Sequence, residues 1–118
     1  MSREIEMNQL IKMIRHFDAE RDWDQFHSPK NLAMALSVEV AELAEIFQWM
    51  SESESSQLSE DKRTKLTEEI GDVMIYLANL SDKFGIDPIK AAKGKLKVNE
   101  AKYPSRIARG SARKYSEY

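Results

Sequence analysis

Apolar residues recur at helical spacing along almost the whole chain, and the two-residue alternation typical of strands is almost absent. A chain with this single dominant period must pack helices against helices, which predicts an all-α fold. The pattern indicates helices at about residues 4–21, 29–50, 60–84 and 88–103. We therefore expect one domain over residues 1–118, four-helix bundle-like, with a basic tail at 104–118.

Local signals support these boundaries. Ser28 followed by Pro29 is a favourable helix start, with serine as N-cap and proline at the first helical position. Ser59 precedes two acidic residues, which suit the positive end of a helix dipole. Gly85 ends the third predicted helix. The stretch 51–59 contains five serines and two glutamates without periodicity, and we expect a surface loop there.

The composition excludes several classes of chemistry. The chain has no cysteine and only two histidines among 118 residues, so it has no disulfide framework, zinc-thiolate site or thiol nucleophile. No apolar stretch is long enough to span a membrane and no signal peptide is recognisable, which predicts a cytoplasmic protein without a membrane partner.

The net charge of −2 conceals two opposed parts. Residues 1–87 hold 18 acidic and 9 basic side chains, whereas residues 88–118 hold 2 acidic and 9 basic ones. One interpretation is an acidic body with a solvated basic tail. The other is a cation site in one part and an anion-binding strip in the other. Nucleic-acid binding is disfavoured, because the acidic body would repel a phosphate backbone.

Two acidic pairs flank the apolar faces of the second and third predicted helices: Glu39-x-x-Glu42 and Glu69-x-x-Asp72. Glu39 falls inside the apolar stripe of its helix. Buried carboxylates are unfavourable unless paired, and we expect no lysine or arginine on either stripe. A hard divalent cation, Mg²⁺ or Mn²⁺, would hold such carboxylates together. The alternative is a set of ordinary salt bridges to another subunit.

A di-iron carboxylate bundle is a weaker alternative, because it requires Glu-x-x-His pairs. Neither His16 nor His27 lies three residues after a glutamate.

Two further groups of residues have the chemistry to bind a nucleotide. The fourth predicted helix carries Lys95, Asn99, Lys102 and Tyr103, where lysines could contact phosphate oxygens, although a solvated amphipathic face is an equal interpretation. The aromatic residues Trp23, Phe26, Trp49 and Tyr76 could stack on a base, although such residues more often belong to a core or an interface.

Four segments together resemble the MazG-like all-α nucleoside triphosphate pyrophosphatases, and most closely their dCTP pyrophosphatase branch. These segments are AERDWDQFHSPKNL at 19–32, EVAELAEIFQW at 39–49, EEIGDVMIYL at 68–77 and RGSARKY at 109–115. The similarity extends from residue 19 to about residue 115. One departure is Ile14, where dCTP enzymes of this branch carry a histidine.

The resemblance implies roles for individual residues. Magnesium would be held by Glu39, Glu42, Glu69 and Asp72. Base and sugar would be surrounded by Trp23, Asp24, Gln25, Phe26, His27, Trp49 and Tyr76. The triphosphate would face Lys95, Asn99, Lys102 and Tyr103, which match the family pattern K-x-x-x-N-x-x-[RK]-Y-P. The attacking water would give its proton to one of the four carboxylates or to Glu45.

The expected activity is Mg²⁺-dependent hydrolysis of a nucleoside triphosphate, such as dCTP, to the monophosphate and pyrophosphate, in control or sanitation of the nucleotide pool. Members of the family form dimers that pair into tetramers with sites between subunits, so we expect a homotetramer. The alternative from another class is a helical regulatory or oligomerisation module that binds nucleotides without cleaving them.

Overall fold

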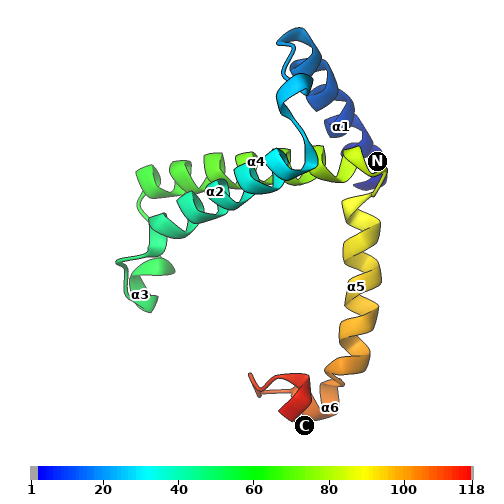
Figure 1. The fold of residues 1–118 in the computed structure, drawn as a ribbon. Coiled ribbons are helices and arrows are strands. Elements are labelled where there is room, and N and C mark those ends of the chain that lie inside the picture. Colours follow the sequence, from blue (N-terminus) through cyan, green and yellow to red (C-terminus); the bar gives the residue numbers. More distant parts are fainter. Residues whose placement is uncertain (1–2, 118) are drawn as a thin grey trace. The chain divides into compact units, whose positions relative to one another are not determined.

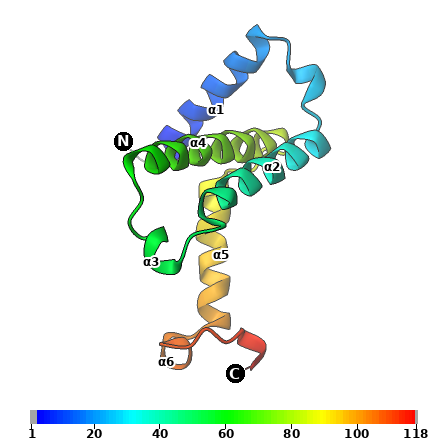
Figure 2. The same cartoon turned by 90° about the vertical axis from the view of Figure 1, so that its left-hand side faces the viewer.

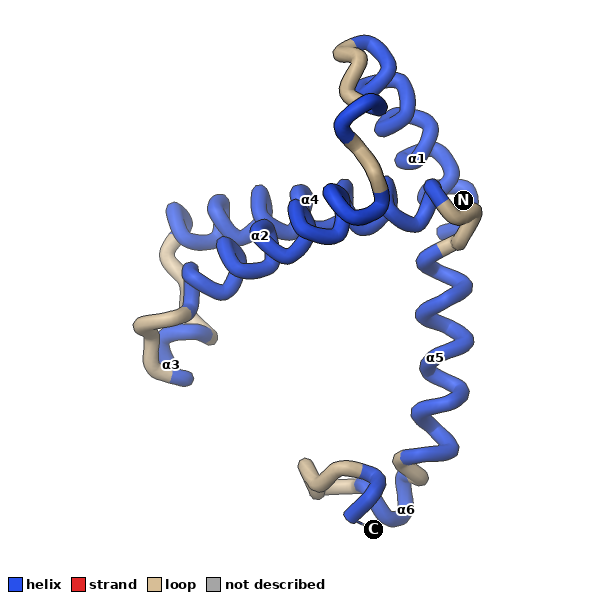
Figure 3. The backbone as a smooth tube through the Cα atoms, viewed as in Figure 1, coloured by secondary structure: helices blue, strands red, loops and turns tan. Residues whose placement is uncertain are grey.

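The computed structural model describes residues 3–117, and among these residues it contains helices and connections but no strand (Figure 3). The chain divides into two compact units, one ending at Ile86 and one beginning at Asp87. The first unit contains α1 (Arg3–Glu20), the 3-10 turn η1 (Asp24–Phe26), α2 (Pro29–Phe47), α3 (Glu52–Ser55) and α4 (Glu60–Lys83). The second contains α5 (Pro88–Lys102), α6 (Ser105–Ala108) and the 3-10 turn η2 (Tyr115–Glu117). The predicted all-α class is confirmed.

The first unit is built on α4, along which α2 lies side by side, while α1 packs against α4 (Figures 1 and 2). The buried apolar side chains come from all three helices: Met7, Ile14, Leu32, Ile46 and Ala78. Arg15 on α1 donates two hydrogen bonds to the Asp82 carboxylate on α4. These bonds and the adjacent positive charge hold the pKa of Asp82 below its usual value.

The main helices begin where the sequence indicates. The hydroxyl oxygens of Ser28 and Ser59 accept hydrogen bonds from backbone N–H groups of α2 and α4, and Asp87 caps α5 in the same way. Gly85 adopts a left-handed φ of 64° just after α4, as expected of a C-terminal glycine.

Two boundaries differ from the sequence prediction. Helix α2 ends at Phe47 rather than near Met50. The predicted surface loop 51–59 contains the short helix α3, which corrects that prediction. The physical reason is a capping box: Ser51 Oγ accepts from the Glu54 backbone N–H, and the Glu54 side chain accepts from the Ser51 N–H.

The second unit consists of α5 and the C-terminal segment that contains α6 and η2. Lys95, Asn99 and Lys102 are spaced four and three residues apart, so they share one face of α5. The segment predicted as a basic tail contains α6 and η2, with Gly110 at a positive φ of 75° between them.

The predicted apolar stripe of α4 is only partly covered within the single chain. Ile70 is 51% exposed and Phe84 is 63% exposed, and Met74 and Leu77 are exposed beside them. On α2, Met34 and Val38 are also exposed, although they lie four residues apart on one face. The first unit therefore leaves apolar side chains of α2 and α4 exposed in the single chain.

No helix among residues 3–117 combines the length and the apolarity that a membrane-spanning segment needs.

Candidate functional site

Three acidic side chains converge where α2 lies along α4. Glu39 on α2 and Glu69 and Asp72 on α4 each bring a carboxylate oxygen to within 4.8 Å of the others. Glu69 and Asp72 are three residues apart on α4, so helical spacing places both of them on the side that faces α2. Three of the four predicted metal ligands are therefore neighbours in space.

The fourth predicted ligand, Glu42, lies one turn further along α2. Its carboxylate is close enough to that of Glu39 to help raise the pKa of Glu39, so it adjoins the same cluster. Glu42 also lines a groove of about 260 Å³ together with Glu45, Ile46, Lys62, Lys65 and Glu69.

The two lysines in this groove, Lys62 and Lys65, are residues that sequence reasoning missed, because it considered only the apolar stripes of the two helices. Lys65 and Lys62 precede Glu69 by four and seven residues, so helical spacing places them on the same face of α4. That spacing was the signal in the sequence. Both lysines therefore line the same groove as Glu42 and Glu69.

The cluster is electrostatically unfavourable as it stands. Burial, together with the carboxylates of Glu42, Glu69 and Asp72, raises the pKa of Glu39 to about 7. One oxygen of Glu39 and one of Glu69, both Oε2, are buried without a hydrogen-bond partner. Unpaired buried oxygens with like charges beside them are what a hard divalent cation neutralises, so these residues fit Mg²⁺ or Mn²⁺.

The raised pKa of Glu39 leads to a prediction about pH. In metal-free protein, the free energy of unfolding should fall as pH rises from about 4.5 to about 7. The folded state holds the Glu39 proton more tightly than the unfolded state does, so stability is greatest below the unfolded pKa and is lost through the folded one. Thermal unfolding of the protein in the presence of a chelator, at pH 5 and at pH 8, measures this loss of stability.

The Glu39→Gln protein is the control for this prediction, because it lacks the titrating group and should show a smaller loss between the two pH values. An equal loss in both proteins would contradict the assignment.

A cavity of about 370 Å³ lies next to the carboxylates, between α1, the connection to α2, and α4. It is lined by Leu10, Met13, Ile14, Phe17, Asp18, Trp23, His27, Asp72, Ile75, Tyr76 and Asn79. Because Asp72 belongs to both the cavity and the cluster, the two adjoin each other. Burial and the nearby carboxylates of Glu39, Asp72 and Asp18 raise the pKa of Tyr76.

The loop after α1 places Trp23 and His27 in this cavity. Asp22 adopts a left-handed φ of 53°, and Gln25 donates to the Asp22 backbone carbonyl and carboxylate, which holds the turn. The Trp23 ring then packs edge-on against Phe17 at 5.5 Å and against His27 at 6.2 Å between ring centroids. The cavity therefore has aromatic walls suited to a flat ring.

The other predicted base-binding residues lie elsewhere. Asp24 pairs with Lys83 at 3.8 Å, Gln25 is engaged with Asp22, and Phe26 is 60% exposed, and none of them lines the cavity. Trp49 follows α2 and is 89% exposed. A contact between the triphosphate and the second unit stays a prediction for Lys95, Asn99, Lys102 and Tyr103.

The fold and the site together define an all-helical class of protein, in which acidic pairs on two adjacent helices are arranged to hold a divalent cation beside an aromatic cavity. The chain belongs to the MazG-like family, whose model matches residues 34–118. This confirms the resemblance seen in the sequence motifs.

Named relatives agree with that assignment. Human dCTP pyrophosphatase 1 is 42% identical, over 98% of this chain and 69% of the relative, and the bovine enzyme of the same name is 41% identical, over 98% and 70%. Among solved structures, a pyrophosphatase from Archaeoglobus fulgidus superposes with a TM-score of 0.79 at 47% identity, covering 84% of this chain and 93% of that one.

Proposed function

The chain is a nucleoside triphosphate pyrophosphohydrolase of the MazG-like family, and we propose that it uses Mg²⁺ and takes dCTP or a related deoxynucleotide as substrate. It releases the monophosphate and pyrophosphate. The relatives called dCTP pyrophosphatase 1 support the reaction and the choice of nucleotide. The biological purpose would be control or sanitation of the nucleotide pool.

The observation that carries this proposal is the convergence of Glu39, Glu69 and Asp72 with two buried, unpartnered carboxylate oxygens among them. A triphosphate carries about four negative charges and cannot approach this cluster without cations between them. Glu39, Glu42, Glu69 and Asp72 would hold Mg²⁺. The bound ion would supply Lewis-acid activation of the α-phosphate and of the attacking water.

The chain's own groups supply the remaining chemistry. Glu45 lines the groove beside Glu42 and Glu69. We expect either Glu45 or one of the four carboxylates to accept the proton of the attacking water. Lys62 and Lys65 line the same groove and would offset the charge on the phosphates. We expect the Lys95, Asn99, Lys102 and Tyr103 face of α5 to contact the triphosphate as well.

The direct test is a turnover panel. Purified protein with Mg²⁺ is incubated with each natural nucleoside triphosphate and with several modified ones, and the products are identified. Release of pyrophosphate and monophosphate, greatest with a pyrimidine deoxynucleotide, is the expected result. Binding of dCTP with metal in a calorimeter, without any product, would instead favour the regulatory module that the sequence left open.

Trp49→Ala tests the predicted base contact of a side chain that is 89% exposed. Loss of a stacking platform should raise KM about tenfold or more and relax the preference among bases, because base stacking on an aromatic ring contributes about 1–3 kcal/mol. Steady-state kinetics with dCTP and dTTP measure both effects. The melting temperature should not change, and unchanged KM and preference would exclude the stacking role.

A second copy of the chain is the proposed partner. The exposed apolar residues on α2 and α4 would pack against the same residues of another protomer, giving dimers that pair into the predicted homotetramer. Exposure of Ile70 and Met74 within the single chain supports this assembly.

A further inference from the structure

We propose that Asp18, acting with Asn79 and His27, makes the cavity select a base that carries an exocyclic amino group. The inference rests on the proposed function, because it assigns base selection to particular residues of the same site. These three residues are not among the clustered carboxylates, and all of them line the cavity: Asp18 from α1, His27 from the loop after it and Asn79 from α4.

The position of the cavity supports a role in base binding. Asp72 is shared between the cavity and the carboxylate cluster, so a nucleotide with its phosphates at the cluster would extend its base into the cavity. Much of the lining is apolar or aromatic, including Phe17 and Trp23. In such surroundings the few polar groups determine which base is accepted, since an unpaired polar contact in a desolvated site is costly.

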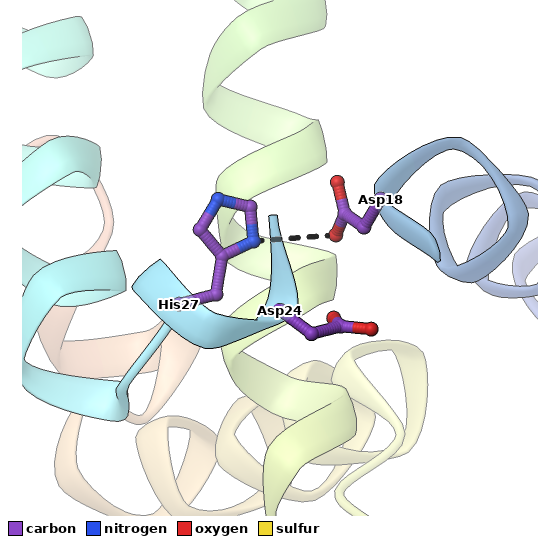
Figure 4. A group of neighbouring side chains, drawn as sticks. All are labelled: Asp18, Asp24 and His27. Carbon is purple, nitrogen blue, oxygen red and sulfur yellow. Dashed lines mark ion pairs between the residues drawn. The ribbon is translucent and has the colours of Figure 1, made fainter. Parts of the chain in front are cut away.

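Asp18 is the most deeply buried of those polar groups, at 4% exposure. Its Oδ2 accepts a hydrogen bond of 2.8 Å from the Asn79 side-chain amide. The same oxygen lies 3.3 Å from His27 Nδ1 (Figure 4). A carboxylate from α1 therefore engages both an amide on α4 and the imidazole in the loop.

Hydrogen-bond chemistry determines how those two partners are oriented. An ionised carboxylate only accepts, so Asn79 turns its NH₂ toward Asp18 and keeps its carbonyl oxygen for other contacts. His27 likewise carries its hydrogen on Nδ1. The 3.4 Å approach between Asn79 Nδ2 and His27 Nδ1 is then not a hydrogen bond, because both atoms are donors to Asp18. In the neutral imidazole, Nε2 is left as an acceptor.

The polar groups organised by Asp18 are therefore acceptors: its own carboxylate, the Asn79 carbonyl oxygen and His27 Nε2. Cytosine presents an exocyclic amino group, a donor, at the position where uracil and thymine present a carbonyl oxygen. These three acceptors would bond the amino group and repel the carbonyl oxygen. The wall formed by Ile14 is apolar and 7% exposed, so it offers no competing donor.

A cation site at this place is the competing explanation, since Asp18, Asp24 and His27 bring ligand atoms within 4.8 Å of one another. Two contacts argue against it. The Asp18 carboxylate is already hydrogen-bonded to Asn79, and the exposed Asp24 pairs with Lys83. Both carboxylates therefore have partners within the protein.

The test compares dCTP with dUTP in the wild-type protein and in Asp18→Asn. Asparagine keeps the size of the side chain but offers an N–H donor, so the ratio of kcat/KM for dCTP to that for dUTP should fall at least about tenfold. His27→Gln, in the loop, should lower the same ratio and serves if Asp18→Asn does not fold. A ratio unchanged in the folded variants would overturn the proposal, because a merely structural role would slow both substrates equally.

Glu20→Gln is the matched control. Glu20 lies two residues further along α1, its side chain is 58% exposed, and it pairs with His16 outside the cavity. Removing that carboxylate should leave the ratio unchanged. If Glu20→Gln lowered the ratio as much as Asp18→Asn does, general loss of negative charge would explain the effect and the proposal would be wrong.

Titration with dCMP and dUMP separates this inference from the proposed function. These monophosphates have no bond for the reaction to cleave, so their affinities report base selection without turnover. Tighter binding of dCMP that is lost in Asp18→Asn would support base selection even if no triphosphate were hydrolysed. Turnover of triphosphates with equal binding of dCMP and dUMP, and equal rates for dCTP and dUTP, would support the enzyme and overturn the role of Asp18.

Discussion

Glu39→Gln is expected to lower kcat for pyrophosphate release by about a thousandfold or more while the helices remain folded. Glu39 lies at the centre of the cluster, with Glu42, Glu69 and Asp72 around its carboxylate. The amide that replaces it carries no charge and is a poor ligand for Mg²⁺, and cation-assisted phosphoryl transfer derives several kcal/mol of transition-state stabilisation from the metal. Steady-state kinetics at saturating Mg²⁺ measure the loss of kcat, and circular dichroism measures whether the helices remain folded.

The same substitution should not destabilise the metal-free protein above pH 7. Burying the Glu39 charge beside other carboxylates is unfavourable in the wild type, as its raised pKa indicates, and glutamine removes that charge. Glu68→Gln is the matched control, because Glu68 is an exposed carboxylate next to Glu69 in the sequence. Near wild-type turnover of Glu39→Gln, or an equal loss in Glu68→Gln, would contradict the metal site.

Ile70→Glu is expected to separate the proposed homotetramer into smaller species. Ile70 is 51% exposed in the single chain, and Met74 and Leu77 continue the same face of α4 by one and two turns. A glutamate carboxylate buried in an apolar interface without a partner costs about 3 kcal/mol or more, which weakens association about a hundredfold. Light scattering after size-exclusion chromatography gives the mass directly.

Thr64→Glu is the control for this substitution, since it adds the same charge at an exposed polar position of α4. It should leave the mass unchanged. An Ile70→Glu protein with the wild-type mass would show that this face of α4 is not the interface.

The local sequence pattern predicted the helices well, because helix-capping and helix-ending signals act over only a few residues. Serine and aspartate caps and a terminal glycine set the ends of α2, α4 and α5 nearly where expected. The prediction was wrong at α3, where a Ser51–Glu54 capping box forms a helix too short for hydrophobic periodicity to reveal.

The acidic pairs were also recognisable in advance, because helical spacing alone places Glu69 and Asp72 on one side of their helix. The Asp18–Asn79 contact was not, since 61 residues separate its partners in the chain. Periodicity assigns each side chain to a face of its own helix but does not say which distant residue that face will meet. The sequence predicted that the aromatic loop binds the base. Only the folded loop, with its turn at Asp22, shows that Trp23 and His27 line the cavity while Asp24 and Phe26 do not.

The sequence by itself determined that this protein is all-helical, without cysteine chemistry, and that its acidic pairs lie on two helices, because those properties follow from composition and from spacing along the chain. The tertiary structure decided that Glu39 from α2 meets Glu69 and Asp72 from α4, and that Asp18 joins Asn79 and His27 in the adjacent cavity. Those contacts depend on how the helices pack, and packing brings together residues that local sequence does not relate.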